Sequence, residues 1–377
     1  MKFKFLSDEL REHLQSVGKV IGGKNQPAIL EYALFEVQGN ELYLTTTDAE
    51  TRITTHFTLM EKEGEDVAFC VRVKQMLEPL REITNQVMEF ILSEEQYELE
   101  VRYNNGHFSF PVVKGEDFGE VAKLGENQLK IEMPIANLVE GLENTLFAVS
   151  PDDVRPIMNG VHFDIRPEHI TFVATNGFML SYYRHSMLDL DVNEPYGVTL
   201  HRKPTQLLSQ VLDKDDEGKV EMTFYQNYAQ FKTDKVELQC RILEGKYPNY
   251  ETVVPVDNDK LLEADRLQLL AATRRVSIFA NKGLDLISCN FTPTQLTLKC
   301  TDQDFSTKAE ETLPISFSAE EARFSFRSEF LIQALTTLST EQIEMKMGDA
   351  TRAAVLTPVG LEAGVEIVVA LMPFVYN

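Results

Sequence analysis

The sequence predicts an α+β protein made of three similar tandem domains, each an antiparallel sheet with helices on one face. Three observations predict it. The 377 residues exceed what one hydrophobic core usually holds, so two or three domains are expected. Similar strand-and-turn stretches recur around Asp48, Asn176 and Asp302, at separations of 128 and 126 residues. Each third of the chain also repeats the order helix, strands, helix, strands.

The first half of each copy is expected to be a helix followed by two strands. In the first copy, Ser7 precedes the helical pattern as a candidate N-cap. The apolar positions at helical spacing are Leu10, Leu14, Val17 and Ile21 in copy one, Ile135, Leu138, Leu142, Leu146 and Val149 in copy two, and Leu269, Ala272, Val276 and Phe279 in copy three. Two strands joined by a tight turn follow at 29–48, 158–176 and 284–302.

The second half of each copy is expected to be a short helix followed by strands with tight turns. The helical segments lie at 73–83, 202–212 and 327–338. Pro79 lies inside the first segment and predicts a short or kinked helix there. Pro204 lies near a helix start, where proline is accommodated. Asn105-Gly106 is a strong hairpin signal between two strands of the first copy.

Polar, turn-rich stretches near residues 125 and 256 separate the three copies. We therefore expect domains at 1–125, 126–256 and 257–377. Because the repeat is far longer than a solenoid period, each copy should be a domain and not one layer of a stacked rod.

The composition is that of a soluble globular protein, with 43% hydrophobic and 25% charged residues. The start MKFKFLSDELREHL lacks the apolar core of a signal peptide, and no apolar run is long enough to span a membrane, so we expect a cytoplasmic protein. No cysteine belongs to a CxxC pair, which predicts buried, reduced thiols and no metal site at Cys70, Cys240, Cys289 and Cys300.

Positive charge is scarce but recurs at equivalent places in the copies. A net charge of −23 would repel DNA if it were evenly spread. Charges farther apart than about 8 Å are largely screened at physiological salt, however, so placement matters more than the total. Lys74, Arg202, Lys203 and Arg327 stand near the starts of the second-half helices, Arg275 stands in the first-half helix of copy three, and Arg155 follows the first-half helix of copy two. These cations are expected to contact duplex DNA through its phosphates, without sequence preference. The alternative is that each is an ordinary solvated helix residue.

No catalytic or cofactor-binding pattern is found in the sequence. The seven histidines form no HxxxH pair and no metal-spaced pair with cysteine, and there is no phosphate-binding glycine loop and no GxSxG turn. Asp48 and Asp302 align with Asn176, and a turn accepts Asp or Asn equally. We therefore expect a turn at these positions, no enzymatic activity and no cofactor. An unrecognised carboxylate chemistry at Asp48 is the alternative.

Two apolar stretches have two interpretations. The segment 367–377 carries no charged side chain, and Phe178, Met179 and Leu180 form an apolar run after Gly177. Burial in the core is the default for such residues. The alternative is a groove that captures short hydrophobic peptides, for which flexible methionine side chains are suited.

Six stretches of the sequence carry a specific resemblance over the whole chain. They are GGKNQPAIL (22–30), TTTDAETRI (45–53), VRPIMNGVHFDI (154–165), FVATNGFML (172–180), LEGKYPNY (243–250) and MPF (372–374). With three similar domains, the chain resembles the bacterial DNA polymerase III β subunit, the sliding clamp.

The resemblance implies a head-to-tail homodimer that closes a ring of six domains around duplex DNA. Helices would line the hole, and antiparallel sheets would form the outside. The ring has no catalytic activity; it tethers the replicative polymerase and other partners, and an ATP-driven clamp loader opens it. A basic bore within an acidic exterior would let the ring slide on DNA.

The resemblance also assigns residues to sites. Lys24 matches a DNA-contacting position, and the tyrosines that some relatives place on DNA correspond to Pro156 and Ile157. The dimer contact maps to Phe108, Phe110, Ile278 and Phe279. The partner-peptide pocket maps to Met158, Thr175, Gly177, Phe178, Met179, Leu180, Pro248, Thr252, Val253, Met372, Pro373 and Phe374. Phe178-Met179 stands where relatives usually have a His-Arg pair, and Thr252 where they often have a basic residue, so this pocket should be more apolar. A scaffold of the same fold that does not hold DNA remains the second hypothesis.

Overall fold

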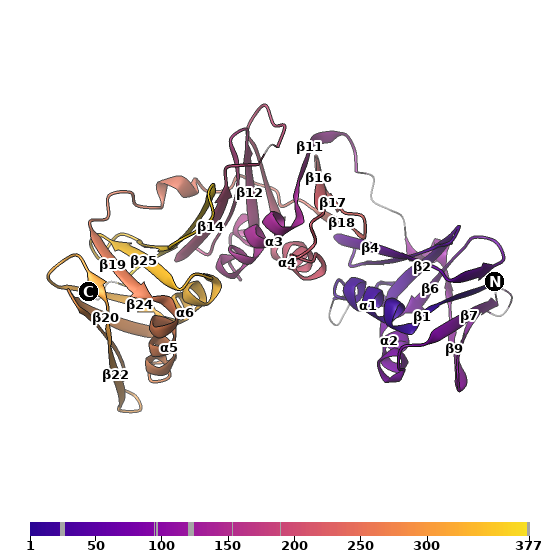
Figure 1. Cartoon of the computed structure of the whole chain (residues 1–377), viewed down its shortest axis with the longest axis horizontal. Coiled ribbons are helices and arrows are strands. Elements are labelled where there is room, and N and C mark those ends of the chain that lie inside the picture. Colours follow the sequence, from indigo (N-terminus) through magenta and orange to yellow (C-terminus); the bar gives the residue numbers. More distant parts are fainter. Residues whose placement is uncertain are drawn as a thin grey trace. The chain divides into compact units, whose positions relative to one another are not determined.

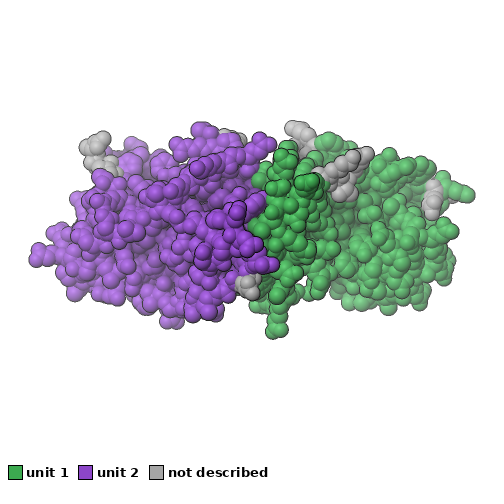
Figure 2. Space-filling view, turned by 90° about the horizontal axis from the view of Figure 1, so that it is seen from above, with its two compact units in different colours: residues 1–136, 206–242 green, residues 137–205, 243–377 purple. Residues whose placement is uncertain are grey.

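The structure is a computed structural model, and it describes residues 1–22, 27–93, 95, 97–119, 124–152, 154–188 and 190–374 (Figure 1). Its contacts divide the chain into two compact units. Unit 1 comprises Met1–Ala136 and Gln206–Ile242, and unit 2 comprises Asn137–Thr205 and Leu243–Asn377 (Figure 2). The middle third of the sequence therefore contributes strands to both units.

Unit 1 contains two antiparallel sheets. The nine-stranded sheet has the order β10 (Val113–Lys114), β6 (Val67–Arg72), β2 (Tyr32–Gln38), β3 (Glu41–Thr47), β4 (Thr51–Thr58), β18 (Val236–Arg241), β17 (Tyr228–Lys232), β16 (Lys219–Tyr225) and β11 (Asn127–Pro134). The five-stranded sheet has the order β5 (Glu61–Glu63), β1 (Lys2–Leu6), β7 (Val87–Ser93), β8 (Glu98–Tyr103) and β9 (Gly106–Pro111).

Unit 2 repeats this plan with a nine-stranded and a four-stranded antiparallel sheet. The larger sheet has the order β15 (Tyr196–His201), β12 (Gly160–Arg166), β13 (His169–Thr175), β14 (Met179–His185), β27 (Val365–Leu371), β26 (Ala354–Pro358), β25 (Gln342–Met347), β19 (Lys260–Asp265) and β23 (Ser316–Phe317). The smaller sheet has the order β22 (Thr307–Pro314), β21 (Gln295–Asp302), β20 (Leu286–Thr292) and β24 (Ala322–Arg327).

The nine-stranded sheets join successive copies of the repeat in the same way. In unit 1, β4 of the first copy pairs with β18 of the second, with Thr51 opposite Cys240. In unit 2, β14 of the second copy pairs with β27 of the third, with Met179 opposite Leu371. The strand after the recurring turn thus lies at the junction of two copies in both units.

The helices occur where the apolar spacing predicts them. They are α1 (Ser7–Gly18), α2 (Val73–Glu82), α3 (Ile135–Glu143), α4 (Arg202–Val211), α5 (Arg266–Ser277) and α6 (Ser328–Thr337). Short 3-10 helices add η1 (Ala28–Glu31), η2 (Gly115–Phe118), η3 (Leu146–Ala148), η4 (Pro156–Met158) and η5 (Tyr250–Thr252). Within the units, α1 packs beside α2 and α5 beside α6 (Figure 1).

Local details differ from the expectations at one helix cap and at the ends of three helices. Ser7 is not an N-cap, because Leu6 holds that position; the Ser7 hydroxyl instead donates to the carbonyl of Thr84 and accepts from the amide of Gln86. The first-half helices end before some of the expected positions. Helix α1 ends at Gly18, before Ile21; α3 ends at Glu143, before Leu146 and Val149; and α5 ends at Ser277, before Phe279. Helix α2 continues past Pro79 but is only ten residues long, and Met76 and Leu80 on either side of the proline are fully buried against the core.

The prediction that the cysteines are buried free thiols is confirmed. All four cysteines are free and buried. Burial raises the pKa of the Cys70 and Cys300 thiols to about 12, so they stay protonated at neutral pH. Among the described residues, no helix combines the length and the apolar character needed to cross a membrane.

Candidate functional site

The recurring turn uses the same kind of side-chain acceptor in all three copies. The side-chain oxygen of Asp48 accepts from the amides of Glu50 and Thr51 at 3.1 and 2.7 Å. Asn176 Oδ1 accepts from the amides two and three residues on at 2.9 and 2.8 Å, and Asp302 Oδ1 does the same at 2.9 and 3.3 Å. Since a carboxylate and an amide oxygen do this equally well, the turn interpretation of these positions is confirmed.

The residue after this Asp or Asn is strained in copy one and relaxed in copy two. Ala49 has φ of 78°, in the left-handed region that alanine rarely adopts, whereas Gly177 takes φ of 87° without a Cβ penalty. In both copies the preceding threonine hydroxyl braces the turn, since Thr47 and Thr175 donate to the carbonyls of Thr51 and Met179 at 2.9 and 2.8 Å. A rigid turn therefore presents Phe178 at its tip.

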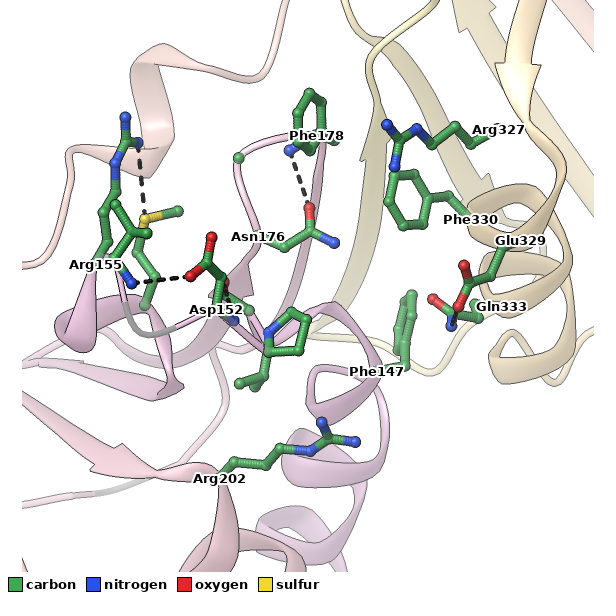
Figure 3. Close-up of a pocket in the computed structure, with 16 residues that line it drawn as sticks. Phe147, Asp152, Arg155, Asn176, Phe178, Arg202, Arg327, Glu329, Phe330 and Gln333 are labelled. Carbon is green, nitrogen blue, oxygen red and sulfur yellow. Dashed lines mark hydrogen bonds between the residues drawn. The ribbon is translucent and has the colours of Figure 1, made fainter. Parts of the chain in front are cut away.

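A cavity of about 660 Å³ opens beside this turn in unit 2 (Figure 3). Its walls come from the turn itself, from the loop and short helices between Phe147 and Met158, and from the start of α6. The lining residues labelled in Figure 3 are Phe147, Asp152, Arg155, Asn176, Phe178, Arg202, Arg327, Glu329, Phe330 and Gln333. Segments far apart in the sequence thus meet at one site, as is typical of ligand pockets.

Two stacked aromatic rings and an arginine form one wall of the cavity. Phe178 is 55% exposed, and its ring stacks on that of Phe330 with centroids 6.4 Å apart and planes 22° apart. The Arg327 guanidinium lies over both rings, 5.2 Å from the Phe178 centroid and 5.7 Å from the Phe330 centroid. Cation–π contacts of this kind orient the guanidinium and leave its N–H edge available to a ligand.

Three of the cations predicted to contact DNA line this cavity. They are Arg155, Arg202 and Arg327. Arg155 Nη1 lies 4.0 Å from the Met158 sulfur, and none of the three makes an ion pair with a described residue. The structure thus brings them together with Met158, Gly177 and Phe178 of the predicted peptide pocket.

The remaining predicted pocket residues lie around β14 in distinct environments. Met179 and Leu180 are 1% and 3% exposed, so their side chains belong to the core, as is also true of Thr175 and Pro373. Met372 is 40% exposed and its amide donates to the carbonyl of Phe178 at 2.9 Å, which ties the end of β27 to the turn. Phe374 is also exposed, and its amide donates to the carbonyl of Ser325.

The segment that carries Pro248, Thr252 and Val253 is fastened to the larger sheet of unit 2. All three side chains are exposed. Tyr247 and Tyr250 of the same segment bury their rings in a core cluster that includes Leu180. The Tyr250 hydroxyl donates to Asp164 at 2.7 Å.

Asp164 also accepts two hydrogen bonds from the Arg166 guanidinium, at 3.1 and 2.8 Å. Burial opposes its ionisation, but the bonds from Arg166 and Tyr250 outweigh burial and hold its pKa below the usual value. Arg184 extends the network by bridging Glu251 and Glu366, both at 3.3 Å. The exposed apolar side chains of the segment therefore sit on a rigid support.

The other predicted cations that the structure describes lie on helices. Lys74 on α2 is highly exposed, and its Nζ lies 3.9 Å from a carboxylate oxygen of Glu78. An ion pair this exposed contributes little to holding the lysine side chain in place. Lys203 lies in the first turn of α4. Arg275 on α5 makes a two-bond ion pair with Glu311 of β22. Lys24 lies outside the described residues.

The predicted dimer residues lie at sheet and helix ends. Phe108 and Phe110 are on β9, an edge strand of the five-stranded sheet, and their rings meet edge to face at 5.2 Å. Ile278 and Phe279 directly follow α5 and are 77% and 40% exposed. Strand β22, against which α5 packs, is an edge strand of the four-stranded sheet.

The contribution of α6 to the cavity could not be predicted from the sequence. Phe330, Glu329 and Gln333 were not singled out, because helical spacing alone does not tell which face of α6 meets the turn at 176–178. Phe147 was not identified because it lies in η3, a short 3-10 helix that the apolar spacing does not predict.

Comparison with known proteins covers nearly the whole chain. The family models of the N-terminal, central and C-terminal domains of the DNA polymerase III beta subunit match residues 1–122, 132–249 and 251–372. The beta sliding clamp of Pseudomonas putida is 26% identical over 360 residues, covering 96% of each chain. That of Escherichia coli K12 is 24% identical over 353 residues, covering 93% of this chain and 94% of the relative.

Solved structures share the fold over the full length. A sliding clamp from Pseudomonas aeruginosa bound to griselimycin superimposes with a TM-score of 0.91 at 23% identity, and the DNA polymerase III beta subunit of Thermotoga maritima with a TM-score of 0.89 at 21% identity. Both alignments cover 100% of each chain. The α+β architecture of three clamp domains is thereby confirmed, and the chain belongs to the DNA polymerase III beta subunit family.

Proposed function

We propose that the chain is a DNA polymerase processivity factor. Two copies join head to tail into a closed ring that encircles duplex DNA without sequence preference and tethers the replicative polymerase in the cytoplasm. The observation that carries this proposal is the threefold repeat, each copy of which is matched by a domain of the beta subunit family. The protein is a non-catalytic subunit without a cofactor, and a clamp loader with its own nucleotide site is its partner for opening.

We place the domain boundaries at 1–125, 126–256 and 257–377. Support comes from the strands that open the second and third copies, since β11 begins at Asn127 and β19 at Lys260. Each is followed directly by a helix, as β1 is followed by α1.

The DNA-facing cations are proposed to be Lys24, Lys74, Lys203 and Arg275, with Arg155, Arg202 and Arg327 nearby in the second and third copies. Those that the structure describes lie on or beside helices, while most carboxylates of this chain of net charge −23 lie outside the helices. Phosphate contacts from lysine and arginine give affinity without base recognition, which a sliding ring requires.

The subunit contact is proposed to join the β9 edge of one copy to the β22 edge of another. An unpaired edge strand offers a row of free backbone donors and acceptors, and proteins rarely leave two long ones uncovered. Phe108 and Phe110 would pack against Ile278 and Phe279, which supplies the apolar core of a stable interface.

The partner pocket is proposed to comprise the exposed apolar side chains around β14. Phe178, Val253 and Met372 would contact a peptide from the polymerase or another partner. Pro248, Thr252 and Phe374 would complete its rim, and Met158, Thr175, Gly177, Met179, Leu180 and Pro373 would shape the floor. The griselimycin-bound clamps of Pseudomonas aeruginosa and Bartonella birtlesii share this fold and provide a ligand with which to probe it.

Retention on DNA tests the proposal against a scaffold that does not hold DNA. Wild-type protein, loaded onto nicked circular duplex by a clamp loader, should remain bound in high salt and be released when the circle is cut. Charge reversal at Lys24, Lys74 and Lys203 to Glu should abolish retention, while Lys299→Glu, on a strand of the smaller sheet, should not. Absence of wild-type retention would favour the scaffold, and full retention of the charge-reversal variant would show that these lysines do not hold DNA.

A further inference from the structure

The junction of the first two copies in unit 1 contains a second cavity, of about 250 Å³. It lies beside the recurring turn of copy one, as the larger cavity of unit 2 lies beside that of copy two. Its lining residues come from η1, from β3, β4 and the turn between them, from the end of η2, and from β17 and β18. These elements all belong to unit 1, so the cavity lies within one compact unit.

This junction cavity uses the repeat positions that form the proposed partner pocket in unit 2. Some of its lining residues lie 128 residues before residues assigned to that pocket. They are Leu30, Thr47, Ala49, Glu50, Thr51 and Arg52, with the counterparts Met158, Thr175, Gly177, Phe178, Met179 and Leu180. The strand register agrees, because Arg52 lies opposite Gln239 across β4 and β18, as Leu180 lies opposite Ala370 across β14 and β27. The tandem repeat therefore places a hollow at the same position in both units.

Arg52 gives the junction cavity a chemistry that its counterpart lacks. It stands where copy two has Leu180, which is 3% exposed. Its guanidinium carbon lies 5.6 Å from the centroid of the Phe118 ring, so the planar group rests on an aromatic face of the cavity wall. In the part of the chain that the structure describes, the Arg52 side chain makes no hydrogen bond and no ion pair. Its N–H donors are therefore available to a ligand.

The surroundings of Arg52 differ from those of other arginines without a carboxylate partner. Those arginines donate to carbonyl or hydroxyl oxygens of the protein, and they include Arg266, Arg274 and Arg323. Burial lowers the pKa of Arg52, against the attraction of Glu36 and Glu237, although the guanidinium stays charged at neutral pH. A partly buried charge without an acceptor is costly, and a carboxylate in the cavity supplies that acceptor.

The remaining walls of the junction cavity are mainly apolar. Leu30 and Phe118 are 9% and 4% exposed, and Tyr228 is half-buried. Glu50 also lines the cavity, but its side chain is exposed and forms no ion pair with Arg52. The cavity is smaller than the roughly 300–1,000 Å³ that is usual for ligand pockets. It therefore suits one compact apolar side chain together with a carboxylate, and not a longer segment.

We propose that the junction cavity binds the carboxyl-terminal residue of a partner polypeptide whose last side chain is apolar. Such a residue carries a carboxylate and a compact apolar group a few bonds apart. Arg52 binds the carboxylate, and Leu30 and Phe118 contact the side chain. Ala49 and Gly119 are exposed, which leaves the rest of the partner chain in solvent. The site is distinct from the proposed partner pocket in unit 2 and does not depend on it.

Two peptides labelled at the amino terminus test the preference. One is Gly-Ala-Ala-Leu with a free carboxylate, and the other is the same peptide with a carboxamide. Fluorescence anisotropy with the full chain should show the free carboxylate binding about tenfold more tightly, because it forms charge-assisted hydrogen bonds with Arg52 and the carboxamide does not. Equal affinities, or no binding of either peptide at millimolar protein, would overturn the proposal. This comparison needs no variant, so it does not depend on how a variant folds.

Arginine variants locate the binding site. Arg52→Leu installs the residue that copy two has at this position and should weaken the free-carboxylate peptide about tenfold, to the affinity of the carboxamide. Arg52→Lys keeps the charge without the planar fork and should have an intermediate effect. Arg241→Leu is the matched control, since Arg241 is an exposed arginine at the end of β18 that does not line the cavity. It should leave both affinities unchanged. An unchanged affinity in Arg52→Leu would contradict the assignment.

Two further measurements separate this site from its alternatives. Phe178→Ala, in the pocket of unit 2, should leave the preference for the carboxylate intact. If this variant loses the peptide and Arg52→Leu does not, the peptide binds in unit 2 and the proposal is wrong. N-acetyl-leucine carries the same carboxylate and side chain without a polypeptide, and should compete with the tetrapeptide at a similar affinity. If N-acetyl-leucine binds and the tetrapeptide does not, the ligand is a free small acid and the assignment to a chain end is overturned.

Discussion

Asn176 shows how one side chain can hold the candidate site. Its Oδ1 accepts two backbone amides at 2.9 and 2.8 Å and so fixes the turn that presents Phe178. Asn176→Ala should lower the free energy of unfolding by about 1–2 kcal/mol, because two turn donors lose their acceptor. Asn176→Asp is the matched control and should be nearly neutral, since Asp48 and Asp302 make the same turn. Chemical denaturation measures both; an equal loss for Asp and Ala would contradict the turn's role.

His162 makes the free energy of unfolding depend on pH, and its environment predicts the direction of that dependence. Its ring stacks on Tyr247 at 4.5 Å and Nδ1 is hydrogen-bonded to Thr199 Oγ1 at 2.9 Å. Burial lowers the pKa of His162 to about 4, against the attraction of Asp164. The unfolded chain therefore takes up a proton before the folded chain does, so this contribution is complete above pH 6.5 and is lost as the pH falls towards 4.

The expected size of this effect is about 2 kcal/mol between pH 7 and pH 5. Urea unfolding at the two pH values should show it as a loss of unfolding free energy. The variant His162→Phe keeps a ring on Tyr247 and removes the titrating group. The unfolding free energy that this variant loses between pH 7 and pH 5 should therefore be about 2 kcal/mol smaller than the wild-type loss. Identical pH dependence in wild type and variant would show that His162 does not titrate as its burial requires.

At the scale of elements, apolar spacing located the helices well. The segments expected at 73–83, 202–212 and 327–338 are helical at Val73–Glu82, Arg202–Val211 and Ser328–Thr337. Spacing did not locate the ends, because caps depend on backbone conformation: Ser7 lies inside α1, while the capping side chain found at α5 is Asp265, which the pattern did not single out.

The α5 cap is a testable element of the fold. Asp265 accepts from the amide of Gln268 at 2.8 Å. Asp265→Ala should lower the free energy of unfolding by about 1 kcal/mol, because the first turn loses an acceptor and a negative charge at its positive end. Asp265→Ser retains a capping oxygen and should recover most of the loss in thermal or urea unfolding. No difference between the Ala and Ser variants would show that this cap does not stabilise α5.

The candidate site could be predicted only in part for a related reason. Gly177, Phe178 and Met158 were found through the resemblance of their motifs. The stack of Phe178 on Phe330 under Arg327 was not, because it joins a turn to a helix start that only the folded unit brings together. The sequence also did not decide whether Met179 and Leu180 are buried, because an apolar run after a turn is compatible with either a core or a groove; both side chains lie in the core.

At the scale of the whole molecule, assembly is the central question. Ile278 and Phe279 are exposed after α5, as an uncovered interface would be. Ile278→Glu with Phe279→Glu should shift the mass in solution from twice the chain mass of 42.9 kDa to that of one chain, because buried charge opposes the contact. Leu267→Glu is the control, being 56% exposed in the first turn of the same helix. Light scattering after size exclusion measures the mass of each variant in solution. If the double variant and Leu267→Glu have the same mass, this interface is contradicted.

Electron-microscopy class averages of the purified protein test the account most directly. The account predicts a closed ring formed by two copies, with a central opening large enough for duplex DNA. A population of single open chains, or of compact particles without an opening, would contradict it.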